Sequence, residues 1–483
     1  MLNIDAIRAD FPGATQQVYL NAAGIGLPPR SAMEAVQRAI ALLGHGPATT
    51  GYQAYYRALG EPLLRAREQA ARLLNVTPAE IAFVDDTTMG LNIALAAIPF
   101  QPGDNIVLCD LEYPQVVISA THQQQYGDVE VRVVHHRDGL VTVDDYVKLI
   151  DTHTRVLLVS SVQWINGLRM DLAAFSELAE QHECFLVVDG IQQLGAIPLD
   201  LSALRVDFLA AGGQKWLNAP FGLGLLYVRG QVQERIRPGL AHGLFALAEP
   251  PEGWLRYLGD PSLTPFLPLP LAPDARRFEI YGMPKTLGAA GLAESLAYVN
   301  QLDQQAVADH ILTLGHFLIE ELTRRGIAVW TPAAAHLRSG IITCTPFLDA
   351  ERIHRLNHTL ETQCIYPSVR YCSGVGGLRI SIHYYTSRED VEKLLAARAQ
   401  LRPSRCGQRL QALTRASRAP GTARATAAST CTPPPSACGS GSTRRRPAGS
   451  TAAPSWTRAK CRSRPARPPS TGKSARRPRR RPP

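Results

Sequence analysis

The sequence predicts an α/β protein built on a mostly parallel β-sheet, and three neighbouring apolar runs carry that prediction. The runs are CFLVVD (184–189), DFLAAG (207–212) and GLGLLYVR (222–229). Each is short and almost wholly apolar, as strands buried on both faces of a parallel sheet are. We expect a polar turn and a short helix between the first two strands, and a loop that carries Lys215 between the last two.

The chain before these runs continues the same alternation of strands and helices. Two helices are expected in 31–75 and an amphipathic helix in 171–182. At 81–97 a strand gives way to a helix at Thr87-Thr88-Met89-Gly90. Further strands are expected at NIVLCD (105–110), EVRVVHH (130–136) and RVLLVSSV (155–162).

The chain after these runs predicts a second, smaller α/β unit. Residues 230–275 are irregular and rich in Pro and Gly, and two long helices follow from about 285. The expected strands are IAVWTP (327–332), SGIITCTP (339–346) and GLRISIHYY (377–385), with helices at 351–361 and 387–399. We therefore predict an N-terminal arm (1–30), a large domain (31–284), a small C-terminal domain (285–400) and a tail (401–483).

Charge is distributed very unevenly between the tail and the rest of the chain. The whole chain has a formal net charge of +10, yet residues 401–483 hold 20 of the 51 basic residues and none of the 41 acidic ones. Residues 1–400 are therefore acidic, with 31 basic against 41 acidic residues. This excludes a nucleic-acid-binding interpretation of the folded part, because only the tail is basic.

The tail has the composition of a disordered segment. It is made mainly of Arg, Pro, Ser, Ala, Thr and Gly and lacks Ile, Val, Phe and Tyr. Such a chain cannot bury enough apolar surface to offset its ordering entropy. Two hypotheses remain open: a basic arm that contacts nucleic acid or anionic surfaces, and, favoured here, a reading-frame slip in a GC-rich gene.

Cysteine usage and hydropathy point to an ordinary cytoplasmic protein. The nine cysteines are scattered, without a C-x-x-C pair or a zinc-type spacing, so neither a disulfide framework nor a metal site is predicted. The start, MLNIDAIRADFPG, has no apolar core of a signal peptide, and no run approaches membrane-spanning length. We expect a cytoplasmic location and no membrane contact.

Lys215 and Asp189 are the residues whose positions point to chemistry. A lysine in a loop after two glycines, between buried strands, can be held as the neutral amine that forms a Schiff base. Asp189 ends its strand at the carboxyl edge of the sheet, where open α/β sheets bind ligands. A buried carboxylate there can hold a pyridinium N–H, as pyridoxal 5′-phosphate (PLP) requires to act as an electron sink.

Three short motifs around these two residues resemble the class V aminotransferase family. They are Asp189-Gly190-Ile191-Gln192, Gly212-Gly213-Gln214-Lys215 and Gly222-Leu223-Gly224. The family includes cysteine desulfurases, selenocysteine lyase and isopenicillin-N epimerase-like proteins, and the resemblance covers residues 15–400. It implies the fold type I of PLP-dependent transferases, with a large sheet of seven-stranded type, and a homodimer. Two positions depart from the family pattern, since Gly212 replaces the usual Ser and Gln214 the usual His.

The resemblance also implies which residues bind the cofactor and the substrate. A Thr pair at a helix start would bind the PLP phosphate, Tyr113 would take the place of the aromatic residue that stacks on the ring, and an arginine would bind the substrate carboxylate. The implied PLP contacts are Thr87, Thr88, Met89, Tyr113, Asp189, Gln192, Gln214 and Lys215. The implied substrate contacts are Asn21, Ala22, Ala23, Asn166 and Arg379. Met283 stands where the family has a Thr that reaches the partner's phosphate, and Lys285 is a substitute for that contact.

The reaction itself stays open between several chemistries. A desulfurase needs a cysteine that takes sulfur as a persulfide, and Cys372, seven residues before Arg379, is the candidate nucleophile. The alternative is that Cys372 is a buried small apolar residue. We predict a PLP-dependent lyase or transferase acting on an amino acid, a cysteine desulfurase or C–S lyase with a sulfur-acceptor protein as a partner. The alternatives are an epimerase or aminotransferase reaction on another amino acid, and a non-catalytic binding protein with a basic tail.

Overall fold

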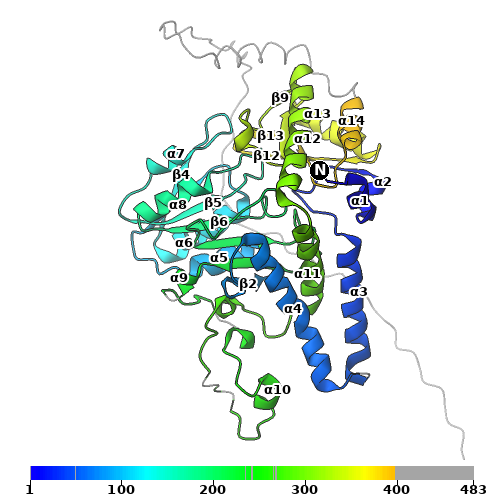
Figure 1. Cartoon of the computed structure of the whole chain (residues 1–483). Coiled ribbons are helices and arrows are strands. Elements are labelled where there is room, and N and C mark those ends of the chain that lie inside the picture. The colour runs from blue at the N-terminus through cyan, green and yellow to red at the C-terminus, as the bar shows by residue number, and fades with distance from the viewer. Residues whose placement is uncertain are drawn as a thin grey trace, which may run out of the picture. The chain divides into compact units, whose positions relative to one another are not determined.

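The computed structural model describes residues 2–397, except 49, 234, 241–242, 265 and 267–268. Helices pack around a seven-stranded sheet and a four-stranded sheet in this part of the chain, which also has a short two-stranded sheet (Figure 1). The α-helices of the described residues are α1 (Ile4–Ala9), α2 (Pro12–Gln16), α3 (Arg30–His45), α4 (Tyr52–Leu74), α5 (Thr87–Ala97), α6 (Pro114–Gly127), α7 (Val143–Val147), α8 (Leu172–Gln181), α9 (Gly230–Gln233), α10 (Trp254–Tyr257), α11 (Thr286–Gln301), α12 (Gln304–Arg324), α13 (Ala350–Glu361) and α14 (Arg388–Ala396).

The large sheet has seven strands and confirms the predicted mostly parallel architecture. In spatial order the strands are β2 (Ile81–Val84), β8 (Gly224–Val228), β7 (Phe208–Gly212), β6 (Phe185–Asp189), β5 (Thr154–Ser160), β3 (Asn105–Cys109) and β4 (Glu130–Val134). Only β8 runs antiparallel to its neighbours. The carboxyl ends of β3, β5, β6 and β7 therefore meet at one edge of the sheet.

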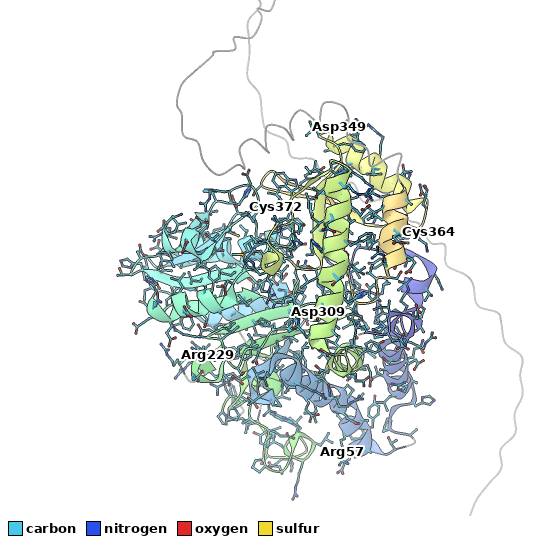
Figure 2. All side chains as sticks on the ribbon, turned by 45° about the horizontal axis from the view of Figure 1, so that its top comes forward. Arg57, Arg229, Asp309, Asp349, Cys364 and Cys372 are labelled. Atoms are coloured by element: carbon cyan, nitrogen blue, oxygen red, sulfur yellow. The ribbon has the colours of Figure 1, made fainter. Side chains whose placement is uncertain are left out.

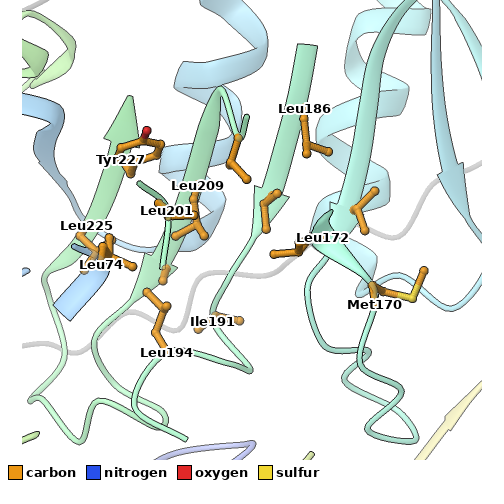
Figure 3. Packing of buried hydrophobic residues seen from close by; sticks show 14 of the residues in the cluster. Leu74, Met170, Leu172, Leu186, Ile191, Leu194, Leu201, Leu209, Leu225 and Tyr227 are labelled. Carbon is orange, nitrogen blue, oxygen red and sulfur yellow. The ribbon is translucent and has the colours of Figure 1, made fainter. Parts of the chain in front are cut away.

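Alternate residues of the central strands enter two different cores, which is why these strands are apolar throughout. On β6, Leu186 and Val188 join the core that includes residues of α4, α8 and α11, and Val187 joins the core beneath α5 and α6. On β7, Leu209 faces the first core and Ala210 the second. Figure 3 shows the first core around Leu186 and Leu209.

The second sheet has four strands and lies between the large sheet and the C-terminal helices. Its spatial order is β12 (Ser368–Cys372), β13 (Val375–Ser381), β10 (Ile341–Thr345) and β9 (Ala328–Val329), with antiparallel pairing throughout. The N-terminal arm joins this part of the chain, because β1 (Val18–Tyr19) pairs in parallel with β11 (Ile365–Tyr366). Asn21 then forms a parallel bridge to Ser381 at the end of β13, which fixes the arm against the second sheet.

One predicted element is wrong. The segment after Asp189 forms a series of turns and not a short helix, because Gly195 takes a φ of +90°, which a continuing right-handed helix does not allow. The boundary predicted at residue 284 stays a prediction, and α11, which follows it, packs into the core of the large sheet through Leu292 and Leu296. The predicted basic tail lies outside the described residues. Among the described helices, none is both long and apolar enough to cross a membrane.

Candidate active site

The ends of β6 and β7 place Asp189 and Lys215 together at the carboxyl edge of the large sheet. Asp189 is buried and accepts a hydrogen bond from the backbone N–H of Ile191 at 2.9 Å. Burial raises the pKa of Asp189 to about 6, although the N–H of Ile191 and the charge of Lys215 act the other way. Burial also lowers the pKa of Lys215 to about 8, with Arg379 adding to the shift and Asp189 opposing it. Lys215 is therefore suited to react as a neutral amine.

The loop that carries Lys215 is held by the N-terminal arm. The N–H of Gly26 donates to the carbonyl of Gln214 at 2.8 Å, and a Cβ at Gly26 would lie 1.9 Å from the carbonyl oxygen of Lys215. The Gln192 amide donates to the carbonyl of Ala23 at 3.2 Å and accepts from the Trp216 indole at 2.7 Å. Gln192 thus links the arm to the lysine loop.

The predicted arm residues lie beside this loop. Ala22 and Ala23 are buried, and the N–H of Ala23 donates to the hydroxyl of Ser381 at 3.2 Å. The side-chain oxygen of Asn21 is buried without a hydrogen-bond partner among the described residues. This oxygen can accept a hydrogen bond from a bound molecule.

The two departures from the family pattern are adjacent in space. A Cβ at Gly212 would come within 2.3 Å of the side-chain oxygen of Gln214. The Gln214 side chain therefore occupies room that the β-carbon of a serine at 212 would need. The two substitutions complement each other in shape, whereas a serine at 212 beside Gln214 would require the Gln214 side chain to move.

The N-terminus of α5 presents its hydroxyl groups at the same edge of the sheet. The Thr87 hydroxyl accepts from the N–H of Gly212 at 2.9 Å, so its own hydrogen is available to a further acceptor. Thr88 is half-buried. The N–H of Met89 is already used, because Asp86 caps the helix by accepting from it at 2.9 Å. Hydroxyls at a helix N-terminus suit an anionic phosphate, while Asp86 adds an opposing charge.

Lys285 offsets part of the negative charge near this helix start. Its ammonium forms an ion pair with Asp85, which directly precedes the cap. Met283, at the position where the family has a threonine, is 61% exposed. The structure therefore places Lys285 beside the N-terminus of α5 within the same chain.

Two aromatic side chains form a wall beside Lys215. The Lys215 Nζ lies 5.4 Å from the centroid of the Tyr113 ring. Tyr113 in turn packs edge-to-face against Trp164, with ring centroids 5.2 Å apart and an interplanar angle of 82°. Trp164 is buried, and its indole Nε1 has no partner among the described residues. The position of Tyr113 fits its predicted role as the aromatic residue over the cofactor ring.

Arg379 is a buried cation without a carboxylate partner in the described part of the chain. It is 2% exposed; its Nη1 donates to the carbonyl of Trp164 at 2.9 Å, and its Nε is unpaired. Burial, followed by the nearby charge of Arg370, lowers the pKa of Arg379 to about 9. A buried guanidinium with free donors is the group that binds a carboxylate as a bidentate fork.

Asn166 and Cys372 are more constrained than the sequence indicates. The Asn166 amide donates to the carbonyl of Gly139 at 2.7 Å and accepts from the N–H of Leu168 at 3.1 Å, so both of its ends hold backbone. The Cys372 thiol donates to the carbonyl of Asp110 at 3.5 Å, and burial raises its pKa. In the view of Figure 2, Cys372 and the exposed Cys364 lie on different sides of α12.

Cys372 also lies on a tight β-hairpin. The turn between β12 and β13 contains only Ser373 and Gly374, with φ angles of +48° and +80°. Such two-residue turns are rigid because their geometry continues the twist of both strands. The segment is therefore unlike a long loop that carries a thiol into and out of a site.

Glu112 was missed by the sequence analysis. This residue is 2% exposed, lies just beyond β3 and accepts hydrogen bonds from Ser160 and Gln163. Burial raises the pKa of Glu112 to about 7, with the charge of Asp189 adding to the shift. The available signal was an acid three residues after the end of a buried strand, at the same sheet edge as Asp189.

The residues at this edge fit PLP. Asp189 can hold the pyridine N–H, Lys215 can form the Schiff base, and the hydroxyls of Thr87 and Thr88 can hold the phosphate. Asn21, Gln163, Trp164 and Arg379 each have a buried polar atom without a hydrogen-bond partner among the described residues, and nine other residues of that part of the chain do as well. The atoms on Asn21, Trp164 and Arg379 are therefore available to a ligand at this edge.

Comparisons with known proteins agree with this interpretation. A cysteine desulfurase from Salmonella gallinarum is 28% identical over 416 residues, covering 81% of this chain and 97% of that protein. A cystine C–S lyase, solved with its product cysteine persulfide, is 25% identical with a TM-score of 0.71, covering 81% of this chain and 99% of its own. A variant of the same lyase carries glycine covalently linked to its PLP cofactor.

A further solved structure supports the fold alone. A cysteine desulfurase from Escherichia coli is 22% identical with a TM-score of 0.70 and covers 83% of this chain and 98% of its own. The sequence profile described as aminotransferase class-V matches residues 18–394, well over half of the chain. The match also confirms the predicted enzyme class and PLP as its cofactor. The chain belongs to the class-V aminotransferase family of PLP-dependent enzymes.

Proposed function

We propose that this enzyme cleaves the C–S bond of a sulfur-bearing α-amino acid such as cysteine or cystine. The observation that carries the proposal is the presence of Lys215, whose pKa burial lowers to about 8, near the buried guanidinium of Arg379, which has no carboxylate partner among the described residues. The cofactor linked to Lys215 would bond the amino group of a substrate, and Arg379 would bind its carboxylate. The two together fit an α-amino acid. The choice of sulfur is supported by the relatives, which are named as cysteine desulfurases and a cystine C–S lyase.

PLP, when bound, supplies an electron sink that stabilises negative charge at the substrate Cα. Asp189 holds the proton on the pyridine nitrogen, and its dry surroundings strengthen that ion pair. Arg379 fixes the substrate carboxylate. Lys215 takes the α-proton on Nζ. The Tyr113 ring lies beside this amine and covers that side of the site.

We favour release of the sulfur group by elimination over transfer of sulfur to Cys372. Elimination releases sulfide from cysteine, or cysteine persulfide from cystine, and hydrolysis of the remaining enamine by one water yields pyruvate and ammonia. Sulfur transfer would produce alanine and a persulfide on Cys372, and it needs a reactive thiol that can move. The Cys372 thiol donates to a backbone carbonyl, has a raised pKa and lies on a two-residue hairpin. These three observations oppose a persulfide-carrying role.

Sulfur transfer is the second candidate, because Cys372 lies directly beside the strand end that carries Tyr113. Its thiol is 3.5 Å from the carbonyl oxygen of Asp110 and 4.0 Å from that of Glu112. A sulfur-acceptor protein would be the partner in that case. The cysteine is thus close enough to the aromatic wall to deserve a direct test.

The test is a product analysis with cysteine and cystine on the purified holoenzyme and its Cys372→Ser variant. Elimination predicts pyruvate and ammonia from both proteins at similar rates. Alanine as the main product, lost in Cys372→Ser, would establish sulfur transfer. An inverted α-carbon or a new keto acid from amino acids without sulfur, with no C–S cleavage, would refute the proposal in favour of epimerisation or transamination.

The proposal includes a homodimer in the cytoplasm. The segment 277–283 resembles one that crosses between subunits in the family, and the apolar side chains of Met283 and Phe221 are 61% and 67% exposed. Such side chains near the site suit a subunit interface. Light scattering of the active protein and cell fractionation test the two statements separately.

A further inference from the structure

Glu112 is a buried carboxylate that the chemistry described above does not use. One of its oxygens accepts from the backbone N–H of Ser160 at 3.0 Å and from the Gln163 amide at 2.9 Å. The same oxygen lies 3.7 Å from the thiol of Cys109, and the other oxygen accepts from the Ser160 hydroxyl. Its donors thus come from β3, from β5 and from the loop that follows β5.

Two of these donors, Ser160 and Gln163, lead directly to residues of the site. Ser160 pairs in register with Asp189 across β5 and β6. Gln163 precedes Trp164, whose carbonyl accepts from Arg379 at 2.9 Å. Glu112 itself is followed in the chain by Tyr113. The Glu112 carboxylate therefore connects the segment that carries Tyr113 to the loop whose Trp164 carbonyl holds Arg379.

We propose that Glu112 is a positioning residue, which fixes Tyr113 and the loop 163–166 around Lys215 so that ring and substrate are held in one orientation. This inference rests on the proposed PLP site. Tyr113 and Trp164 lie in two different segments and contact each other through their rings. The residues just before them, Glu112 and Gln163, join the same two segments by a hydrogen bond. Without the carboxylate, the Ser160 N–H loses its acceptor in a buried place, where unpaired donors are costly. The Gln163 amide keeps only the weak acceptor of the Cys109 sulfur at 3.5 Å. The loop must then shift to find other partners.

The arrangement allows a test that separates position from charge. In Glu112→Gln the remaining carbonyl oxygen can still accept from Ser160 N–H and Gln163, and the new amide can donate to the Ser160 hydroxyl, which then accepts. Glu112→Ala removes the acceptor altogether. Asp207→Asn is the matched control, because Asp207 is equally buried and accepts from a backbone N–H at 2.9 Å, yet it precedes β7 at the opposite edge of the sheet.

The measurements are the circular dichroism of the PLP absorption band, PLP content, and KM and kcat for cystine. We expect Glu112→Ala to bind PLP but to lose most of the circular dichroism of the PLP absorption band. Its KM for cystine should rise about tenfold or more, because the loop that holds Arg379 shifts. Glu112→Gln should restore both to within about threefold of wild type. Asp207→Asn should lower the melting temperature and leave the shape of the band unchanged.

A second variant keeps the inference testable if Glu112→Ala does not fold. Gln163→Met removes the amide that donates to Glu112. It should weaken the circular dichroism of the PLP band and raise KM, as Glu112→Ala does. A normal band and KM in a folded Glu112→Ala or Gln163→Met would overturn the inference, as would a Glu112→Gln variant no better than Glu112→Ala. The wild-type band itself tests the PLP site, so failure of the proposed function is recognised separately.

Discussion

The pKa of Lys215 offers a quantitative test of the site in the protein freed of PLP. The ordinary pKa of lysine is 10.5, and burial lowers that of Lys215 to about 8. The folded chain therefore releases this proton at lower pH than the unfolded chain does. Between about pH 8 and 10.5 the unfolded state binds more protons, so the free energy of unfolding rises with pH in that window.

The size of the effect follows from the shift of the pKa. One pKa unit corresponds to about 1.4 kcal/mol, so a shift from 10.5 to about 8 corresponds to roughly 3 kcal/mol. Lys215→Met keeps an unbranched side chain as far as Cε and removes the titrating amine. The difference in unfolding free energy, wild type minus Lys215→Met, should rise by roughly 3 kcal/mol between pH 8 and 10.5.

Two measurements check this expectation. Urea unfolding of both PLP-free proteins across the pH range gives the stability difference directly. The rate at which PLP added to the wild-type protein develops its lysine-linked absorbance should reach half its maximum near pH 8. Parallel stability curves for the two proteins, or a midpoint near the ordinary value for lysine, would show that Lys215 is not desolvated and would refute the reasoning.

Four further outcomes are expected. Lys215→Ala should purify without a borohydride-reducible band; a variant that keeps one has its PLP on another lysine. Asp189→Asn should keep that band and lose turnover by about 100-fold, as electrostatic groups in dry sites typically contribute; unchanged turnover would make the acid structural. Arg379→Lys should raise KM about 10- to 100-fold, since hydrogen bonds to a charged group contribute about 1.5–3 kcal/mol, and an unchanged KM would place the carboxylate elsewhere. A chain that ends at residue 402 should keep PLP and turnover, because every proposed site residue lies at or before Arg379; a folded but inactive protein would contradict this.

The strands and the reactive pair could be predicted because their signals are local. β6 is apolar at every position before Asp189 since its side chains alternate between two cores, and this is visible in the sequence without any partner. Asp189 ends β6 and Lys215 lies three residues after β7, so the rule that ligands bind at the carboxyl edge was enough to pair them. The turns after Asp189 were mispredicted, because the left-handed Gly195 is compatible with several backbone shapes until its neighbours are known.

The supports of the site could not be predicted, since they depend on contacts between distant segments. The bonds of Glu112 to Ser160 and Gln163 span 48 and 51 residues, and the bond from Arg379 to the carbonyl of Trp164 spans 215. No periodicity in the chain encodes such pairings. Asn166 is a predicted substrate contact whose amide nitrogen and oxygen are both bonded to backbone groups. The sequence does not show these bonds.

The three buried charged groups of the site, on Asp189, Lys215 and Arg379, have a common physical reason. Burial pushes Asp189 and Lys215 toward their neutral forms and lowers the pKa of Arg379, which has no carboxylate partner among the described residues. Each of these departures costs stability in the protein alone, and each is relieved by a group that PLP or an α-amino acid carries: a pyridinium for Asp189, a carbonyl carbon for Lys215 and a carboxylate for Arg379. Stabilisation by ligand binding should therefore be large. The same burial that destabilises the free protein is what makes the amine of Lys215 reactive and the guanidinium of Arg379 selective.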